Sequence, residues 1–153
     1  MALPLEIDDA EIIVRGMCTP YHVSSKGKVK PEAFDPTPGT DEVSVMRYDG
    51  MGADACKSQA LQLEDPTQQK VYRGLAALTA FTIRGEGAAV IDSRHHFYGH
   101  ADIKLGFVVQ PGEPLPPETL LRLRALTKAL AKAVRYYPDP SPATPAWLGE
   151  AIK

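Results

Sequence analysis

Histidines are concentrated in one short segment of this chain. The sequence holds four histidines, and His95, His96 and His100 lie close together, just before Asp102. Histidine is the side chain whose ordinary pKa lies nearest neutral pH, and it is the commonest metal ligand in proteins. The segment is therefore the first candidate for a site of chemistry.

Two imidazoles and a carboxylate in this segment form a ligand set that suits zinc, manganese or iron. We therefore consider His96, His100 and Asp102 as ligands of a divalent transition metal, the one cofactor that the sequence indicates. The spacing is not diagnostic, because the separation of the two histidines is typical of helices, whereas Gly99 and the alternating flanks indicate strands. A metal-free histidine cluster that locks a corner of a sheet is the alternative.

General acid–base chemistry without a metal is a second hypothesis for the same segment. His100, held by Asp102, would act as the base. Arg94 or Arg84 would stabilise an anion, and Arg15 and Arg94 complete the candidate catalytic set. This combination of groups is suited to phosphoryl or nucleotide substrates.

Arg15 follows an Ile-Ile-Val run, so its side chain is expected to be half-buried. A buried arginine needs an acidic partner or an anionic ligand. A structural ion pair with Asp92 or Asp102 is therefore the alternative to a ligand-binding role.

Four further residues are candidate ligand-binding groups: Ser44, Arg47, Arg84 and Asp92. Ser44 lacks the Gly-x-Ser-x-Gly setting of a nucleophilic serine, so a nucleophilic role is not expected for it. The ligand expected for such a set is a small anion.

Hydrophobic alternation predicts the strands that carry these residues. The expected strands cover residues 11–16, 42–48, 79–84, 88–94 and 100–109. The last three are expected to form an antiparallel meander, with turns at 85–87 and 97–99. Side chains two residues apart share one face of a strand, so this meander would gather a polar patch. The patch would hold Asp92, Arg94, His96, His100 and Asp102.

Two helices are expected between and after the strands. A turn at Asp49-Gly50 is followed by a weak apolar stripe, which indicates a short surface helix over 53–64. The stronger signal covers 117–136, where proline in the first turn precedes a long apolar stripe. The expected fold class is α+β, an antiparallel or mixed sheet of about five strands with one long C-terminal amphipathic helix packed on it.

The chain length is typical of a single domain, expected over residues 1–153. Residues 19–40 are rich in proline and predict a long ordered loop. Residues 138–153 are expected to form a Pro-rich extended tail, pinned by Trp147 and Leu148.

The net charge of −2 argues against a protein built to coat nucleic acid. A stripe of Arg124, Lys128 and Lys132 could contact phosphates, but a solvated helix face is the more common role for such a stripe.

Neither a long apolar segment nor a signal peptide is recognisable, so no membrane association is expected. Cys18 and Cys56 indicate reduced thiols, and a cytoplasmic location is expected.

Several short motifs occur in order along the chain: Ile-Val-Arg15, Phe34-Asp-Pro36, Val43-Ser44-Val45 and His100-Ala101-Asp102-Ile103. This order resembles a set of small, uncharacterised bacterial proteins with an N-terminal strand Arg, Phe-x-Pro, Ser-Val and late His-Ala-x-Ile elements. The resemblance covers residues 11–105, apart from an insert over 53–73 in this chain, and brings no activity with it.

A second likeness is to ADP-ribosyltransferase-like folds, in which an early strand arginine or histidine, a mid-chain strand serine and a late glutamate clasp NAD. Arg15 and Ser44 would stand at the first two positions. The third would fall to Glu86, which the sequence places in a turn.

Two functions from different classes therefore remain open. The leading hypothesis is a small soluble ligand- or partner-binding accessory protein, which the first resemblance connects with a bacterial conflict or defence operon and a protein partner encoded nearby. The alternative is an enzyme that acts on a nucleotide or phosphorylated substrate through His100, Asp102, Arg15 and Arg94, with or without a metal.

Overall fold

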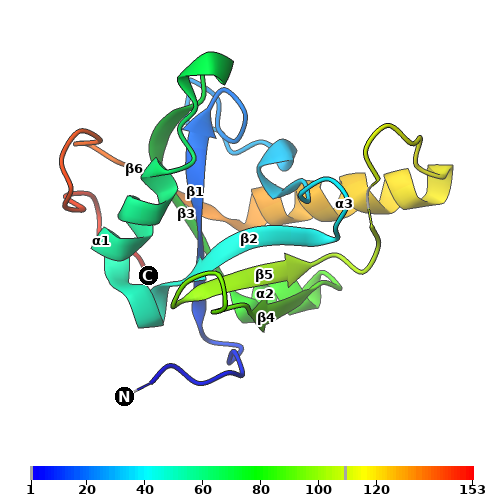
Figure 1. The fold of residues 1–153 in the computed structure, drawn as a ribbon, viewed down its shortest axis with the longest axis horizontal. Helices are drawn as coiled ribbons and strands as arrows, with labels where there is room; N and C mark the ends of the chain where they lie inside the picture. The colour runs from blue at the N-terminus through cyan, green and yellow to red at the C-terminus, as the bar shows by residue number, and fades with distance from the viewer. Residues whose placement is uncertain (1, 109) are drawn as a thin grey trace.

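The computed structural model describes residues 2–108 and 110–153. Within these residues the chain forms an antiparallel sheet of six strands in the order β4-β5-β2-β1-β3-β6 (Figure 1). The strands are β1 (Ile12–Thr19), β2 (Glu42–Arg47), β3 (Val71–Thr79), β4 (Ala89–Asp92), β5 (His100–Lys104) and β6 (Arg135–Pro138). The helices are α1 (Tyr48–Leu61), α2 (Ala80–Gly85) and α3 (Pro117–Ala133), with short 3-10 turns η1 (Pro31–Phe34) and η2 (Pro66–Gln68). The expected α+β class with a long C-terminal helix is confirmed.

The sheet has an apolar core on each face. Alternation along β2 sends Val43 and Val45 to one face and Met46 to the other. The first face is covered by α2, α3 and η1, which contribute apolar side chains to one buried cluster. The second face is covered by α1 and the C-terminal segment. No helix in residues 2–108 or 110–153 combines the length and apolar character needed to cross a bilayer.

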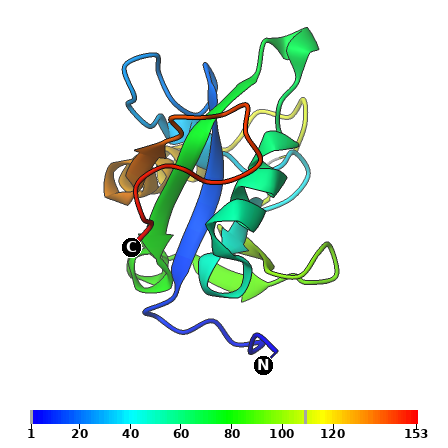
Figure 2. The ribbon, with the colours of Figure 1, turned by 90° about the vertical axis from the view of Figure 1, so that its left-hand side faces the viewer.

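A buried lysine fastens the C-terminal segment to the second face. The ammonium of Lys57 is fully buried, lies 2.9 Å from Asp139 and donates to the carbonyls of Ser141 and Ala146. The hydroxyl of Tyr72 donates to the same aspartate. Figure 2 shows this segment crossing the sheet on the side that carries α1. The Pro-rich tail is therefore ordered by polar contacts as well as by apolar packing.

Trp147 packs partly into the second core, as expected for a residue that pins the tail. Leu148 is 60% exposed, so its expected pinning role is wrong. Ile152, which the sequence analysis did not single out, is buried in the same core.

Strands β1 and β2 hold the two halves of the sheet together over a short stretch. Their register pairs Ile13 with Arg47 and Val14 with Met46, after which β2 leaves β1 at a wide angle (Figure 1). Helix α1 lies close against β1 at this point, because Gly16 has no side chain to hold it away. A Cβ placed on Gly16 would lie 2.6 Å from the Cβ of Ala60.

The expected strand over 79–84 is wrong, and the expected three-strand meander is wrong with it. Strand β3 ends at Thr79, whose side chain accepts a hydrogen bond from the backbone N–H of Thr82 and caps α2. Strand β3 pairs with β1 and β6, while β4 and β5 form the remaining hairpin. Alternation did not predict β3, because residues 74–78 are buried in succession and the sequence of this strand therefore does not alternate.

Three other boundaries differ from expectation. The last helix ends at Ala133 rather than 136, because residues 135–138 join the sheet as β6. The turn expected at Asp49-Gly50 lies inside the first part of α1, before a non-helical break at Gly52. Strand β5 ends at Lys104, short of the expected 109, and Val109 itself lies outside the described residues.

The close approach of α1 to β1 can be tested by adding one methyl group. Gly16→Ala is expected to lower the free energy of unfolding by about 1–3 kcal/mol, because an overpacked contact forces backbone shifts. Urea unfolding followed by the fluorescence of Trp147 measures this change. Gly85→Ala is the matched control, since a Cβ there meets nothing within 4 Å and a helical alanine is favourable. Equal stability of the two variants would contradict the packing described.

Candidate functional site

A pocket of about 290 Å³ lies where β1 and β2 part, against α1. Its polar lining comes from Arg15, Ser44, Gln59, Gln62 and His100, and its apolar lining includes Met46, Leu63 and Phe97. Arg15 and His100, which are far apart in the sequence, therefore face one cavity. The pocket depends on the divergence of the strands, since continued pairing would close it.

Arg15 spans the gap between the diverging strands. Its Nε donates to the carbonyl of Ala33 and its Nη1 donates to the carbonyl of Ser44 at 2.6 Å. Burial lowers the pKa of the guanidinium to about 10, against opposing effects of Cys18 and Asp35. The group is therefore still charged at neutral pH.

Among the described residues, no carboxylate forms an ion pair with Arg15, and Asp35 acts on it only through space. The structural ion pair expected with Asp92 or Asp102 is thus not formed. Two neutral carbonyls accept hydrogen bonds from this cation but supply no net negative charge. The Arg15 charge is therefore free to attract an anion.

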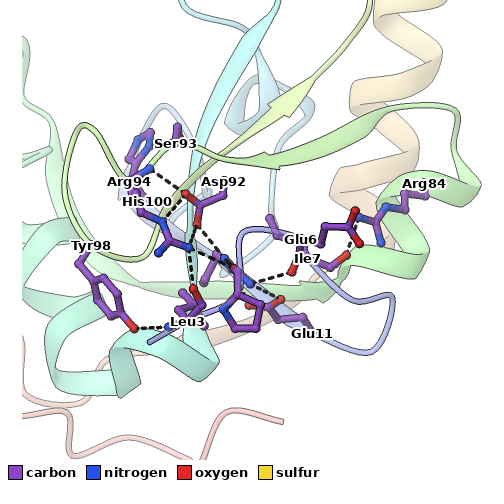
Figure 3. Close-up of polar contacts among 12 residues, drawn as sticks. Leu3, Glu6, Ile7, Glu11, Arg84, Asp92, Ser93, Arg94, Tyr98 and His100 are labelled. Carbon is purple, nitrogen blue, oxygen red and sulfur yellow. Dashed lines mark hydrogen bonds and ion pairs between the residues drawn. The ribbon is translucent and has the colours of Figure 1, made fainter. Parts of the chain in front are cut away.

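His100 lies on β5, opposite Met46 of β2, and is 7% exposed. The hydroxyl of Ser93 lies 2.5 Å from its Nδ1 (Figure 3). Burial, followed by the neighbouring His96 and His95, lowers the pKa of His100 to about 4. The imidazole is therefore neutral at neutral pH.

Ser93, rather than Asp102, holds the His100 ring. No hydrogen bond joins His100 to Asp102 in the described part of the chain, although their side chains share a face of β5. The sequence analysis missed Ser93. Its signal was the turn itself, since the backbone N–H of Ser93 donates to the carbonyl of His100 and places the two side chains together.

Asp102 is a buried acid that forms no ion pair within the described residues. It is 3% exposed, and Lys104, which is bound by Asp41 and Glu42, acts on it only through space. Its carboxylate and one ring nitrogen each of His96 and His100 lie within 4.8 Å of one another. The structure thus gathers the three residues that the sequence analysis considered as metal ligands. Such a group can hold a divalent transition metal.

Arg47 is placed differently from Arg15, although both belong to the β1–β2 junction. Its side chain is 1% exposed and lies 2.7 Å from Glu11 and 2.7 Å from Asp92. Further hydrogen bonds reach the carbonyls of Pro4 and Glu6 (Figure 3). Burial opposes the charge, but the hydrogen bonds to the two acids outweigh it and raise the pKa of Arg47. The N–H donors of Arg47 are therefore engaged by acceptors inside the protein.

Arg94 and Arg84 also bind the N-terminal segment. Arg94 lies 2.9 Å from Asp92 and donates to the carbonyl of Leu3. Arg84 lies 2.7 Å from Asp9 and donates to the carbonyl of Ile7. Both are therefore held by internal partners, and neither lines the pocket with Arg15.

The single polar patch expected around the histidines is split by the register of β4 and β5. Asp92 pairs with Ala101, whereas Asp102 pairs with Ile91. Directly opposed residues share a face, so Asp92 and Asp102 lie on opposite faces of the sheet. His96, His100 and Asp102 stay together, while Asp92 and Arg94 join the Arg47 network.

The three residues considered for the likeness to ADP-ribosyltransferase-like folds do not lie together. Arg15 and Ser44 line one pocket, but Glu86 lines a separate pocket beside α3. Comparisons with protein-family models, curated proteins and solved structures each found no match.

The Arg47 network is predicted to support the fold. Arg47→Met is expected to lower the free energy of unfolding by about 3–5 kcal/mol, because two buried carboxylates lose their cation. Arg84→Met is the control and should cost about 1 kcal/mol or less, since that ion pair is exposed. Chemical unfolding of both variants measures the difference. An Arg47→Met protein as stable as the wild type would contradict a structural role.

The same network predicts a pH dependence. Burial favours the neutral acid, but hydrogen bonds from Arg94 and Arg47 outweigh it and lower the pKa of Asp92 from 3.8 to about 2. The Asp92 charge therefore stabilises the fold above about pH 4, and this contribution, on the order of 2 kcal/mol, is lost as the pH falls toward 2. Asp92→Asn should thus lie below the wild type in unfolding free energy at pH 6, with the gap narrowing at pH 2. A gap of constant size would contradict the assignment.

Proposed function

We propose that the protein is a ligand-binding accessory protein whose pocket between β1 and β2 holds a small organic anion. The observation that carries the proposal is the half-buried charge of Arg15, which faces the pocket without an ion-pair partner among the described residues. A cation in this state costs the folded protein free energy unless an anion joins it. Arg47, on the neighbouring strand, is fully paired and gives the contrast.

The rest of the lining supports an anion with an apolar body. Ser44, His100 and two glutamines offer hydrogen bonds, and Met46 and Phe97 offer apolar contact. The volume of about 290 Å³ lies at the lower end of the range for small-molecule pockets. A carboxylate or phosphate ester of modest size fits this combination of charge, hydrogen-bonding groups and space.

An enzyme that acts on a nucleotide or phosphorylated substrate is the second candidate, because His100 lies on the pocket wall. A general base works best when its pKa lies near the working pH. The pKa of His100 is lowered to about 4 by burial and then by His96 and His95, so it is a weak base at pH 7. Arg94, the expected anion stabiliser, is held by Asp92. Binding is therefore better supported than catalysis.

Calorimetric titration in EDTA-containing buffer tests the binding proposal. Phenyl phosphate and benzoate serve as anionic probes, and benzyl alcohol serves as a neutral probe of similar shape. The anions are expected to bind more tightly than the alcohol. Arg15→Met should weaken the anions by about 10- to 100-fold, because a hydrogen bond to a charged group contributes about 1.5–3 kcal/mol. Arg15→Lys keeps the charge but not the planar fork, so its affinity for the anions should lie between those of the wild type and Arg15→Met.

Arg124→Met is the matched control, since it makes the same change on an exposed position of α3. It should leave the affinity for phenyl phosphate unchanged. Equal affinity for anions and alcohol, or equal affinity of wild type and Arg15→Met, would contradict the proposal. Turnover of p-nitrophenyl phosphate that disappears in His100→Ala would instead favour the enzyme.

A further inference from the structure

We infer that His96, His100 and Asp102 form a binding site for a divalent transition metal, which shares His100 with the pocket wall but does not include Arg15. This inference goes beyond the proposed anion binding. The side chains come from β5 and from the turn that precedes it, and their ligand atoms lie within 4.8 Å of one another.

The charge of Asp102 is the first step of the argument. A carboxylate that is 3% exposed gains from a counter-charge at contact distance, and among the described residues no ion pair supplies one. Lys104 lies two residues away on the same face of β5, but its ammonium is engaged by Asp41 at 2.7 Å and Glu42 at 3.8 Å. The acid therefore lies beside two imidazoles, and no cation of residues 2–108 or 110–153 forms an ion pair with it. A metal ion would supply that cation.

The orientation of His100 is the second step. Its Nδ1 is occupied by the hydroxyl of Ser93 at 2.5 Å, which leaves Nε2 as the ligand nitrogen (Figure 3). Metal-binding histidines characteristically have their other ring nitrogen held by such a partner, which fixes the tautomer and the ring plane. Ser93 is buried at 3% exposure, so this support is rigid. Ser93 is thus a positioning residue for the metal site.

His96 supplies the third ligand, from the turn that precedes β5. Two ligands on one tetrahedral zinc ion lie about 3.4 Å apart when the bonds are about 2.1 Å long. The observed limit of 4.8 Å therefore needs a small approach of one ligand. His100 and Asp102 are fixed on a strand, whereas the His96 ring is exposed in the 93–99 turn and can move toward them.

The ligand set selects a class of metal. Two imidazoles and one carboxylate suit zinc and ferrous iron, and a three-ligand protein site leaves coordination positions for water or a ligand. Calcium and magnesium prefer sites built from oxygen ligands and fit this set poorly. The His95 ring lies 4.2 Å from His96 but does not belong to the three-residue group, so it provides an internal control.

Equilibrium dialysis with Zn²⁺, followed by elemental analysis, tests the site on the full chain after treatment with EDTA. The wild type is expected to bind one zinc ion per chain, and Co²⁺ in its place should give the visible absorption of a nitrogen- and oxygen-ligated site. His96→Ala and Asp102→Asn should each lower the affinity by about ten-fold or more, and Ser93→Ala by about ten-fold. His95→Ala should bind as the wild type does.

Stability without metal provides a second readout. In EDTA, Asp102→Asn should unfold at the same urea concentration as the wild type or higher, because it removes a buried charge that forms no ion pair within the described residues. Zinc should then stabilise the wild type but not Asp102→Asn. Wild-type zinc affinity in His96→Ala or Asp102→Asn, or a clear loss of stability of Asp102→Asn in EDTA, would overturn the inference.

The two proposals fail separately. Arg15→Met should keep the zinc site, and EDTA-treated wild type should keep the affinity for phenyl phosphate. Zinc binding without phenyl phosphate binding would refute the anion pocket alone. Phenyl phosphate binding without zinc binding would refute the metal site alone.

Discussion

The junction between β1 and β2 is the constraint on which the rest of this structure depends. The two strands pair at Ile13↔Arg47 and Val14↔Met46 and then diverge. Each strand contributes an arginine to the junction. Arg47 is neutralised by buried carboxylates, whereas Arg15 crosses the gap and finds neutral carbonyls. One guanidinium therefore holds the sheet together, and the other leaves a positive charge facing a cavity.

The surrounding elements keep this gap open and bounded. Gly16 lets α1 lie against β1 and form one wall of the pocket. On the far side of that helix, Lys57 binds the C-terminal segment, so α1 is held from both sides. The N-terminal segment is bound by Arg47 and Arg94, and neither of these arginines lines the pocket (Figure 3).

Local patterns predicted those parts of the molecule that depend on neighbouring residues. The alternation of β2 and the shared face of His100 and Asp102 follow from side-chain direction along single strands, and His96 joins these two residues from the adjoining turn. The register between strands does not follow from alternation, and a shift of one residue moves a side chain to the other face. Asp92 was misplaced for this reason.

Local sequence patterns did not predict the contacts between segments that are distant in the chain. The strand β3 is buried on both faces, so its residues do not alternate, and its partners β1 and β6 are remote in the chain. The Lys57–Asp139 ion pair joins residues that have no local relation. The half-burial of Arg15 was expected from its apolar flank, but the lack of an acid beside it emerged from the fold.

Nuclear magnetic resonance of the arginine side chains tests the contrast between the two guanidinium groups most directly. In a protein labelled with ¹⁵N, the Nε–H signals of Arg15 and Arg47 are assigned by substitution and followed while phenyl phosphate is added. The account predicts a saturable shift of the Arg15 signal and no change in the Arg47 signal, because only the former faces the pocket. A stationary Arg15 signal, or equal shifts of both signals, would contradict it.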